Sequence, residues 1–551
     1  MRNRLSVAPL SAPVLANRAG ARGAEGGRVR FSDVVRVRSA NQAKALALPL
    51  LSLQGIVNRK GPRLYVVWPE PLERFCWQWL EYYKSKGWVE AREITPREAL
   101  AKYRKEAKGV VVFDPSVPET LNLAVSMSAA RSLLVSPPEM VGFLSRLGHK
   151  VAEDLRGKFK DTSSVREYMA RHILPVLNKR RFFLLPSTKP DGQRASFEVI
   201  LLRGLLTDYA IAQRVPSLGL TPRREKRAMA EELLSLFSFL RRLDNFFWAM
   251  GYPYPHDLEP AFVRVVTKAG GVALLGSYFA ANFSFHSWMG DRNRRLKQSR
   301  RERKIVYDPK KVYISIALCD LCFNSLQSRY YGLWDEASKA DFPFSWWMDP
   351  IAMELCPAIV EYYYRTKHPS QIFFGANPGG RITPKFCENL EEYLKRGRPL
   401  AERADLRVVA FSNVGAVEDR RLFRLLSKNF PHAEGFIYAY IDDILPQCWF
   451  VNGKPFVGLR RELNITPPKY DLCERLSSWI RRHSERPLFL AIYVLISHKL
   501  RVEFLLREAK KLERTFPDQI VWVNGEEMMK LVRRHFLEQR CWGRGRRCWA
   551  C

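Results

Sequence analysis

The chain has 551 residues, of which 47% are hydrophobic and 12% aromatic. This length and composition exclude a largely disordered protein and allow three or four domains of about 150 residues each. The 90 Lys and Arg residues outnumber the 56 Asp and Glu residues, for a formal net charge of +34. The charge suits anionic partners, but it is spread along the chain and is not gathered in one nucleic-acid-binding motif. We therefore expect no nucleic acid among the partners.

The N-terminal residues 1–30 are rich in Gly, Ala and Arg and are predicted to form a disordered leader. Leu5–Ala16 makes a poor secretion signal, because Pro9 and Pro13 interrupt its apolar stretch. The longest apolar runs, such as Leu488–Ile496, are far shorter than the roughly 20 residues that cross a bilayer. The sequence therefore predicts no membrane span.

The first predicted domain covers residues 31–160. An apolar helical pattern over 43–53 precedes a strand at 63–67, and a second strand at 109–113 precedes a helix over 121–130. This alternation of strand and helix predicts an N-terminal α/β domain with a parallel sheet.

A mostly helical middle domain is predicted for residues 161–300, where the clearest helical pattern covers 227–243. It ends in a dense basic run, Arg292–Lys304. We interpret this run as a solvated linker, because it lacks the interleaved aromatic residues of a nucleic-acid stripe. A polyanion-binding site is the alternative.

The C-terminal region 305–538 alternates strands with helices. Strands are predicted at 312–317, 371–374, 407–411, 435–441, 488–496 and 520–523, each followed by a helical pattern. Such repetition predicts a βα-repeat domain, either barrel-like or doubly wound. The fold class of the whole chain is therefore α/β.

Cysteine usage argues against a disulfide scaffold, since ten cysteines are sparse for this length. Two Cys-x-x-Cys pairs occur, Cys319 with Cys322 and Cys548 with Cys551, and neither has a second pair or a histidine pair nearby. We predict buried thiols, no metal site and no cofactor. Residues 539–551 form a basic, cysteine-containing tail.

Polar side chains follow the predicted strands, where both βα architectures place their working residues. They are Asp320 and Asn324, then Asn377 to Arg381, Ser412 and Asn413, Asp442 and Asp443, and His498. Asp320 paired with Asp442 or Asp443 would supply the two carboxylates that glycoside hydrolysis requires. Helix capping or pairing with arginine is the alternative role for each of these acids.

Aromatic residues are dense between Trp334 and Tyr364, where Trp346, Trp347 and Tyr362–Tyr364 occur. Such rings can stack on the flat faces of sugars, or they can pack in the core. The chain has no P-loop, Rossmann fingerprint, GxSxG elbow or HExxH motif, which argues against the commonest NTPases, lipases and metalloproteases.

Several segments resemble the GxGYxYP putative glycoside hydrolases, bacterial proteins associated with polysaccharide use. Leu53–Arg59 reads LQGIVNR, the N-terminal signature of that family, and Thr207–Ala212 is similar to its RDYAVA segment. Asn282–His286 and Ser345–Tyr364 resemble the stretches before and within its C-terminal domain. The resemblance covers residues 34 to 536.

The departures from the family pattern concern its acidic and eponymous motifs. Where the family carries SDGDN, this chain reads Cys319–Asn324, with Asp320 as the first acid and Cys322 in place of the second. The eponymous motif is expected at 378–384, where Gly380 and Pro384 are kept but Arg381 and Thr383 replace the tyrosines. Gly251–Pro255 reads GYPYP but lies upstream of the acidic motif, so we interpret it as a coincidence of composition.

The resemblance implies a glycoside hydrolase that acts on poly- or oligosaccharides and is exported. On this hypothesis Asp320, Asp442 and Asp443 are catalytic. The substrate-binding residues would be Asn324, Trp346, Trp347, Asn377, Gly380 and Arg381. A catalytically degenerate carbohydrate-binding relative is the second hypothesis, and a polyanion-binding protein that uses Arg292–Lys304 is the third.

Overall fold

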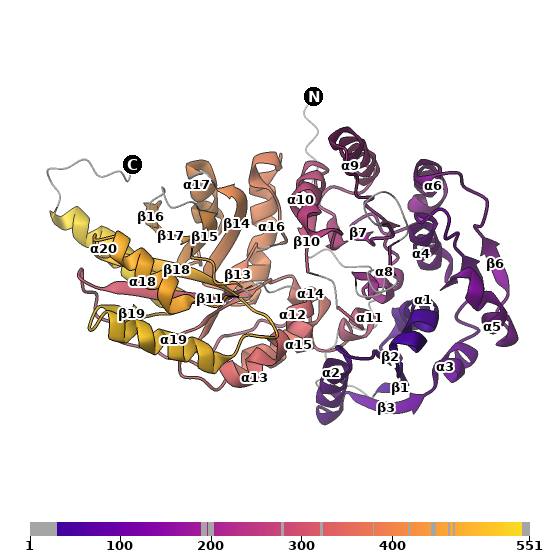
Figure 1. Cartoon of the computed structure of the whole chain (residues 1–551), viewed down its shortest axis with the longest axis horizontal. Coiled ribbons are helices and arrows are strands. Elements are labelled where there is room, and N and C mark those ends of the chain that lie inside the picture. The colour runs from indigo at the N-terminus through magenta and orange to yellow at the C-terminus, as the bar shows by residue number, and fades with distance from the viewer. Residues whose placement is uncertain are drawn as a thin grey trace.

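The computed structural model describes residues 30–188, 195–196, 203–276, 280–319, 323–377, 379–416, 419–441, 448–460, 463–466 and 469–542. The predicted leader up to residue 29 and the tail from 543 lie outside these ranges. The described chain forms two halves, with small sheets N-terminally and a barrel C-terminally (Figure 1). The α/β class predicted from the sequence is confirmed.

The first small sheet has the strand order β2(Leu64–Val67), β1(Arg30–Arg36), β3(Val89–Ile94), and all its pairs are parallel. Helix α1(Ala40–Val57) begins at Ser39, whose side chain accepts a hydrogen bond from Gln42 N. Most residues of α1 are apolar or small, and the helix is buried over nearly its whole length. It lies at the centre of the N-terminal half (Figure 1).

Two further parallel sheets complete the N-terminal half. One has the order β5(Leu134–Ser136), β4(Val110–Val112), β6(Val151–Asp154), and the other β10(Val272–Leu274), β9(Trp248–Gly251), β7(Arg181–Leu184), β8(Ser217–Leu218). The last sheet lies in the region predicted to be mostly helical, and its strands are only two to four residues long. The remaining helices here are α2(Glu73–Ser85), α3(Pro96–Lys102), α4(Thr120–Arg131), α5(Val141–Arg146), α6(Thr162–Tyr168), α8(Thr207–Ala212), α9(Lys226–Leu240), α10(Glu259–Lys268) and α11(Phe283–His286).

Seven strands of the described C-terminal half close into a parallel barrel. Their order is β11(Val312–Cys319), β12(Ser345–Met348), β13(Ile372–Ala376), β14(Val408–Ala416), β15(Gly435–Ile441), β17(Lys454–Arg460) and β18(Leu488–Leu495), and β18 pairs with β11 again. Pairing of β11 with β12, with Leu318 opposite Trp346, closes the ring. Of the two predicted architectures, the barrel is therefore the one observed.

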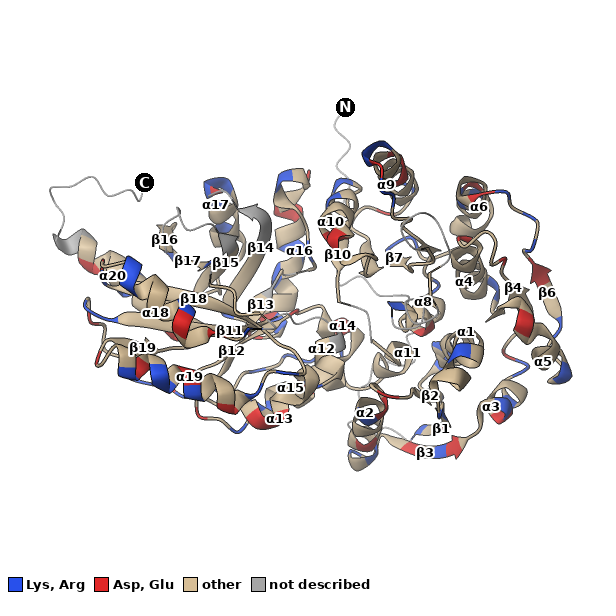
Figure 2. Ribbon diagram, in the orientation of Figure 1, with Lys and Arg blue, Asp and Glu red and all other residues tan. Residues whose placement is uncertain are grey.

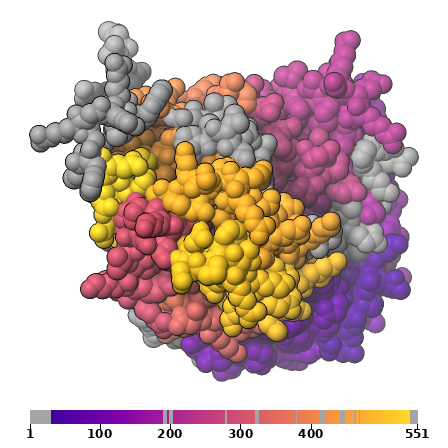
Figure 3. Space-filling view, turned by 60° about the vertical axis from the view of Figure 1, so that its left-hand side comes forward, coloured from indigo at the N-terminus to yellow at the C-terminus, as the bar shows by residue number. Residues whose placement is uncertain are grey.

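Two strands at the barrel rim and an outer layer of helices complete this half. β19(Ile520–Trp522) pairs with the start of β11, and β16(Cys448–Val451) is antiparallel to β17. The helices are α12(Phe323–Gln327), α13(Leu333–Ala337), α14(Ala352–Leu355), α15(Pro357–Thr366), α16(Leu390–Arg403), α17(Arg420–Asn429), α18(Leu472–Arg482), α19(Val502–Thr515) and α20(Gly525–Trp542). In the space-filling view the yellow and orange C-terminal helices form the near face, and the N-terminal half lies against the barrel (Figure 3).

The basic run Arg292–Lys304 joins the two halves without regular secondary structure and packs along the barrel, while most of its basic side chains stay exposed. The side chain of Gln298 bonds to the backbone of Phe373 on β13, and Arg303 donates to Trp522 O at 2.9 Å. Several of its arginines form ion pairs, namely Arg294 with Glu361, Arg300 with Asp405 and Glu526, Arg301 with Asp341, and Arg303 with Glu527. We call residues Arg292–Lys304 the strap, because several of their arginines form ion pairs with other parts of the protein.

Replacing Arg300 with glutamine is expected to lower the free energy of unfolding by about 2 kcal/mol, because Glu526, whose side chain is 7% exposed, would lose its cation. Arg295→Gln is the matched control, since Arg295 belongs to the same strap but is exposed. Chemical denaturation followed by circular dichroism measures both variants. Equal stability of the two would contradict a structural role for Arg300.

Positive charge is distributed over the helices of both halves (Figure 2). This agrees with the even spread of Lys and Arg along the sequence. Among the described helices, none combines the length and the apolar character that a membrane crossing requires.

Candidate functional site

The carboxyl ends of the barrel strands form the candidate site, since ligands of parallel βα folds bind there. Asp320 follows β11, and Asp442 and Asp443 follow β15, but all three residues lie outside the described ranges, as do the side chains of Asn324, Ser412 and Asn413. The strand order nevertheless separates β11 from β15 by three strands on one side and two on the other. The two predicted carboxylate positions therefore follow strands on opposite sides of the barrel.

A carboxylate that the sequence analysis did not select, Asp349, directly follows β12. Ser345 and Trp347 face the barrel interior, because Ser345 Oγ lies 3.2 Å from Ser315 Oγ of β11 and Trp347 packs on Phe374 of β13. Side chains alternate along a strand, which places Asp349 on the same interior side. Because Asp349 follows a strand, it would have been a candidate site residue, but the sequence predicts no strand at the aromatic segment 345–348.

Asp349 has an unusual environment for an acid in so basic a protein. No cationic side chain of the described chain pairs with it, and its carboxylate accepts one hydrogen bond, from Ile351 N to Oδ1 at 3.3 Å. Burial raises the pKa of Asp349 to about 7, and the Ile351 N–H opposes that shift. The residue as a whole is nevertheless partly exposed to solvent. An unpaired carboxyl with a raised pKa at a strand end is typical of a proton donor.

The register of the barrel places Asp349 between two other predicted site residues. Leu318 lies opposite Trp346, so β11 and β12 end side by side, and Asp320 comes next on the β11 side. Met348 lies opposite Gly375, so Asn377 follows on the β13 side. Asn377 is 7% exposed. Three neighbouring strands, β11, β12 and β13, thus lead at the mouth of the barrel to Asp320, Asp349 and Asn377, in that order.

Tyr393 of α16 lies close to Asp349. Its hydroxyl donates to Gly380 O, and its pKa is raised by burial and by the charge of Asp349. Gly380 has a φ of +115°, and a Cβ there would meet Leu274 Cδ2 at 2.9 Å. Only glycine therefore fits this turn beside the N-terminal half.

Arg381 ties the barrel to the third N-terminal sheet. Its backbone exchanges two hydrogen bonds with Ala273 of β10, at 2.8 and 2.9 Å, and its guanidinium pairs with Glu259. Tyr252 of the GYPYP segment also donates to Glu259. The expected motif position at 378–384 and the upstream segment Gly251–Pro255 therefore meet at one carboxylate between the two halves.

The two predicted substrate-binding tryptophans point in opposite directions. Trp346 is fully buried on the helical side, where its indole N–H donates to Gln371 Oε1 at 2.9 Å and its ring contacts Trp334 and Tyr330. Trp347 faces the barrel interior and is 6% exposed. Of the two tryptophans, only Trp347 is therefore directed toward the space inside the barrel. His498, after β18, is exposed.

The segments that carry the family resemblance form a buried polar network in the N-terminal half. Asn282 Oδ1 accepts from Gln54 Nε2 at 2.6 Å and from Val66 N at 2.8 Å, and Asn58 Nδ2 donates to Ser284 Oγ at 2.9 Å. Asp208 accepts from Ser284 N at 2.9 Å, and burial raises its pKa to about 7. Leu53–Arg59, Thr207–Ala212 and Asn282–His286 thus meet in space in the N-terminal half (Figure 1).

Close packing explains the glycine of the LQGIVNR segment. A Cβ at Gly55 would meet Asp208 O at 2.5 Å and Ile211 Cβ at 2.8 Å, so α1 and α8 can approach only with glycine there. In the described part of the chain, no group of three or more His, Cys, Asp and Glu side chains is arranged to hold a metal ion.

Comparisons with known proteins match this architecture. Family models match residues 37–105 (GxGYxYP_N 1st domain), 107–172 (GxGYxYP_N second domain) and 310–533 (GxGYxYP putative glycoside hydrolase C-terminal domain). A search of curated proteins finds no match.

Two solved structures are similar to this chain. A putative hydrolase from Bacteroides thetaiotaomicron has a TM-score of 0.74 and 16% identity, over 92% of this chain and 96% of that one. A putative polysaccharide deacetylase from Mycobacterium smegmatis has a TM-score of 0.30 and 15% identity, over 44% of this chain and 96% of that one. The first likeness shows a shared fold over both halves.

Proposed function

We propose that this chain, which belongs to the GxGYxYP putative glycoside hydrolase family, hydrolyses glycosidic bonds of poly- or oligosaccharides at the mouth of its C-terminal barrel. The observation that carries the proposal is the unpaired carboxyl of Asp349, which lies beside the strand ends that lead to Asp320 and Asn377. Family membership supplies the substrate class.

The environment of Asp349 suits the part of the general acid. With a pKa of about 7, Asp349 is protonated at neutral to mildly acidic pH and can give its proton to the glycosidic oxygen as the bond to the anomeric carbon breaks. Water supplies the new hydroxyl at that carbon. An ionised partner from Asp320, Asp442 or Asp443 either activates the water or first forms the covalent intermediate.

The substrate groove is completed by neighbouring residues of the barrel. Asn324, Trp347 and Asn377 follow or belong to the strands next to Asp349 and would contact the sugar. Gly380 and Arg381 act by holding the N-terminal half against the turn after β13, because their contacts are with Leu274, Ala273 and Glu259. They therefore hold one side of the proposed site in place.

A reducing-end release assay across a broad polysaccharide panel tests the function, with the Asp320→Asn variant alongside. We expect release by the wild type and a loss of about 10²–10⁴-fold in the variant, because one acid–base group would be missing. Circular dichroism of the variant serves as the folding control. Saturable sugar binding without release would instead identify a carbohydrate-binding relative, which the replacement of the second motif acid by Cys322 would explain.

A further inference from the structure

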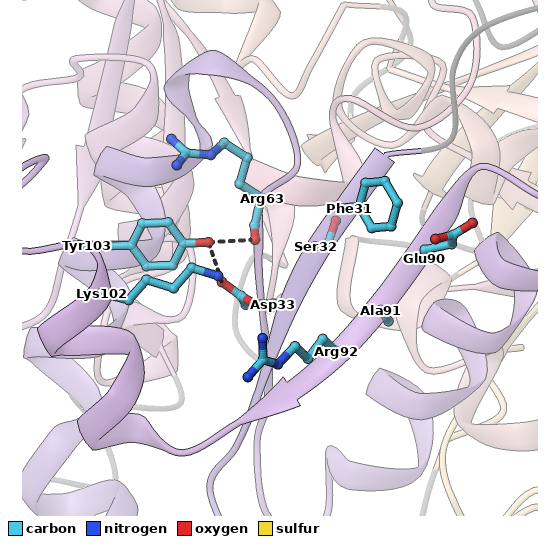
Figure 4. A pocket seen from close by; sticks show the side chains of 9 residues that line it. All are labelled: Phe31, Ser32, Asp33, Arg63, Glu90, Ala91, Arg92, Lys102 and Tyr103. Atoms are coloured by element: carbon cyan, nitrogen blue, oxygen red, sulfur yellow. Dashed lines mark hydrogen bonds and ion pairs between the residues drawn. The ribbon is translucent and has the colours of Figure 1, made fainter.

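A cavity of about 540 Å³ opens on the first N-terminal sheet, in the half of the molecule away from the barrel. Strands β1 and β3 and the end of α3 line it, with Phe31, Asp33, Glu90, Arg92, Lys102 and Tyr103 among the lining residues (Figure 4). Its volume lies in the range of roughly 300–1,000 Å³ that is typical of small-molecule sites.

Strand register places four of these side chains in a square on one face of the sheet. Phe31 lies opposite Glu90, and Asp33 lies opposite Arg92. Neighbouring strands are about 4.8 Å apart, and residues two apart on a strand share a face. An aromatic ring, two carboxylates and a guanidinium are thus presented together to the cavity.

Of the three charged residues in this square, only Asp33 has hydrogen-bond partners among the described residues. Asp33 is 5% exposed, and its carboxylate accepts from Lys102 Nζ and from the Tyr103 hydroxyl, both at 2.5 Å. Glu90 and Arg92 are exposed and form no hydrogen bond or ion pair with the described residues. The cavity therefore offers one free acceptor group and one free donor group, whose charges balance.

Phe31 supplies the apolar surface. It is 77% exposed, and it is the only exposed aromatic side chain in the described part of the chain. One exposed apolar residue needs no explanation by itself. Here the exposed ring stands directly beside a free carboxylate, at the edge of a cavity.

We propose that this cavity binds a neutral pyranose residue of a saccharide, separately from the barrel. The flat C–H face of a sugar ring can cover the exposed ring of Phe31. Its hydroxyls can donate to Glu90 and accept from Arg92, which suits a ligand that carries both donors and acceptors and no net charge. The cavity thereby holds a chain of sugars on the N-terminal half, while the proposed cleavage occurs in the other half.

Titration calorimetry and saturation-transfer NMR with maltose, cellobiose and xylobiose test this site without any turnover. We expect at least one disaccharide to bind saturably, Phe31→Ala to weaken that binding about tenfold or more, and Glu90→Gln and Arg92→Gln to weaken it about fivefold each. Leu234→Ala and Arg97→Gln are the matched controls, since both residues are exposed and lie outside the cavity. Their affinities should equal that of the wild type.

The Asp349→Asn variant separates this proposal from the proposed function. Binding that survives Asp349→Asn and fails in Phe31→Ala supports the cavity. Binding that fails in Asp349→Asn and survives in Phe31→Ala belongs to the barrel mouth and overturns it, as does the absence of saturable binding by all three disaccharides. Circular dichroism of Phe31→Ala excludes unfolding as the cause.

Discussion

Replacing Asp349 with asparagine is expected to lower kcat by about 10²–10⁴-fold while the protein stays folded. Asparagine has nearly the same shape and can still accept the hydrogen bond from Ile351 N, but it has no proton to give to the leaving oxygen. Because no cation of the described residues pairs with this carboxyl, its loss leaves none of their charges uncompensated. The variant should therefore be at least as stable as the wild type, and kcat on the polysaccharide identified by reducing-end release measures the effect.

The pH dependence of the wild type follows from the same group. The pKa of Asp349 is raised to about 7, so its proton-donor form is populated below that pH and is lost as the pH rises through it. The kcat profile should consequently fall on its alkaline side near pH 7.

Asp518→Asn is the matched control for Asp349→Asn, because Asp518 is exposed and precedes β19 at the opposite end of the barrel. An unchanged rate in Asp349→Asn would remove Asp349 from the mechanism.

Replacing Asn282 with alanine is expected to destabilise the N-terminal half by about 3–5 kcal/mol. Asn282 is fully buried, and its side chain accepts from Gln54 Nε2 and Val66 N and donates to Val66 O at 2.8 Å. Alanine would leave these groups without their partner in a site closed to water. Its Cβ would also occupy a left-handed conformation, since φ is +61°.

Two variants separate the hydrogen bonds from the backbone conformation. Asn452→Ala carries the same left-handed cost, with φ at +50°, but it lies in an exposed turn. Asn282→Gly keeps the conformation and loses the hydrogen bonds. Chemical denaturation should give a small loss for Asn452→Ala and a large loss for both Asn282 variants. A loss confined to Asn282→Ala would attribute the effect to backbone strain.

The network around Asn282 also changes the meaning of the most specific sequence motif. Gln54 and Asn58 of LQGIVNR bond to Asn282 and Ser284, which are more than 200 positions away in the sequence. The motif therefore acts in the structure as a link between α1 and the end of the third sheet region. The hydrogen bonds of Gln54 and Asn58 thus give this family signature a structural role in the N-terminal half.

The sequence by itself determined the fold class, the strand-and-helix repeat of the C-terminal half and the family. These follow from local patterns, because runs such as Val312–Ala317 and Leu488–Ile496 are almost entirely apolar, as is typical of strands buried on both faces. The placement of Asn377 and Asp320 after predicted strands likewise depends only on residues that are neighbours in the sequence. No strand is predicted from the sequence at Ser345–Met348, because the tryptophans there are interpreted only as sugar-stacking or core residues.

Only the tertiary structure decided the properties that depend on distant pairs of residues. Closure of the barrel needs β12 to meet β11, and the raised pKa of Asp349 comes from burial without a cationic partner among the described residues, which no local pattern can reveal. The arginines of the strap find Glu526 and Glu527 more than 220 positions away. Phe31, Glu90 and Arg92 form one surface because parallel pairing aligns β1 with β3. Burial, pairing and charge compensation arise from such contacts, and these set the chemistry of each site.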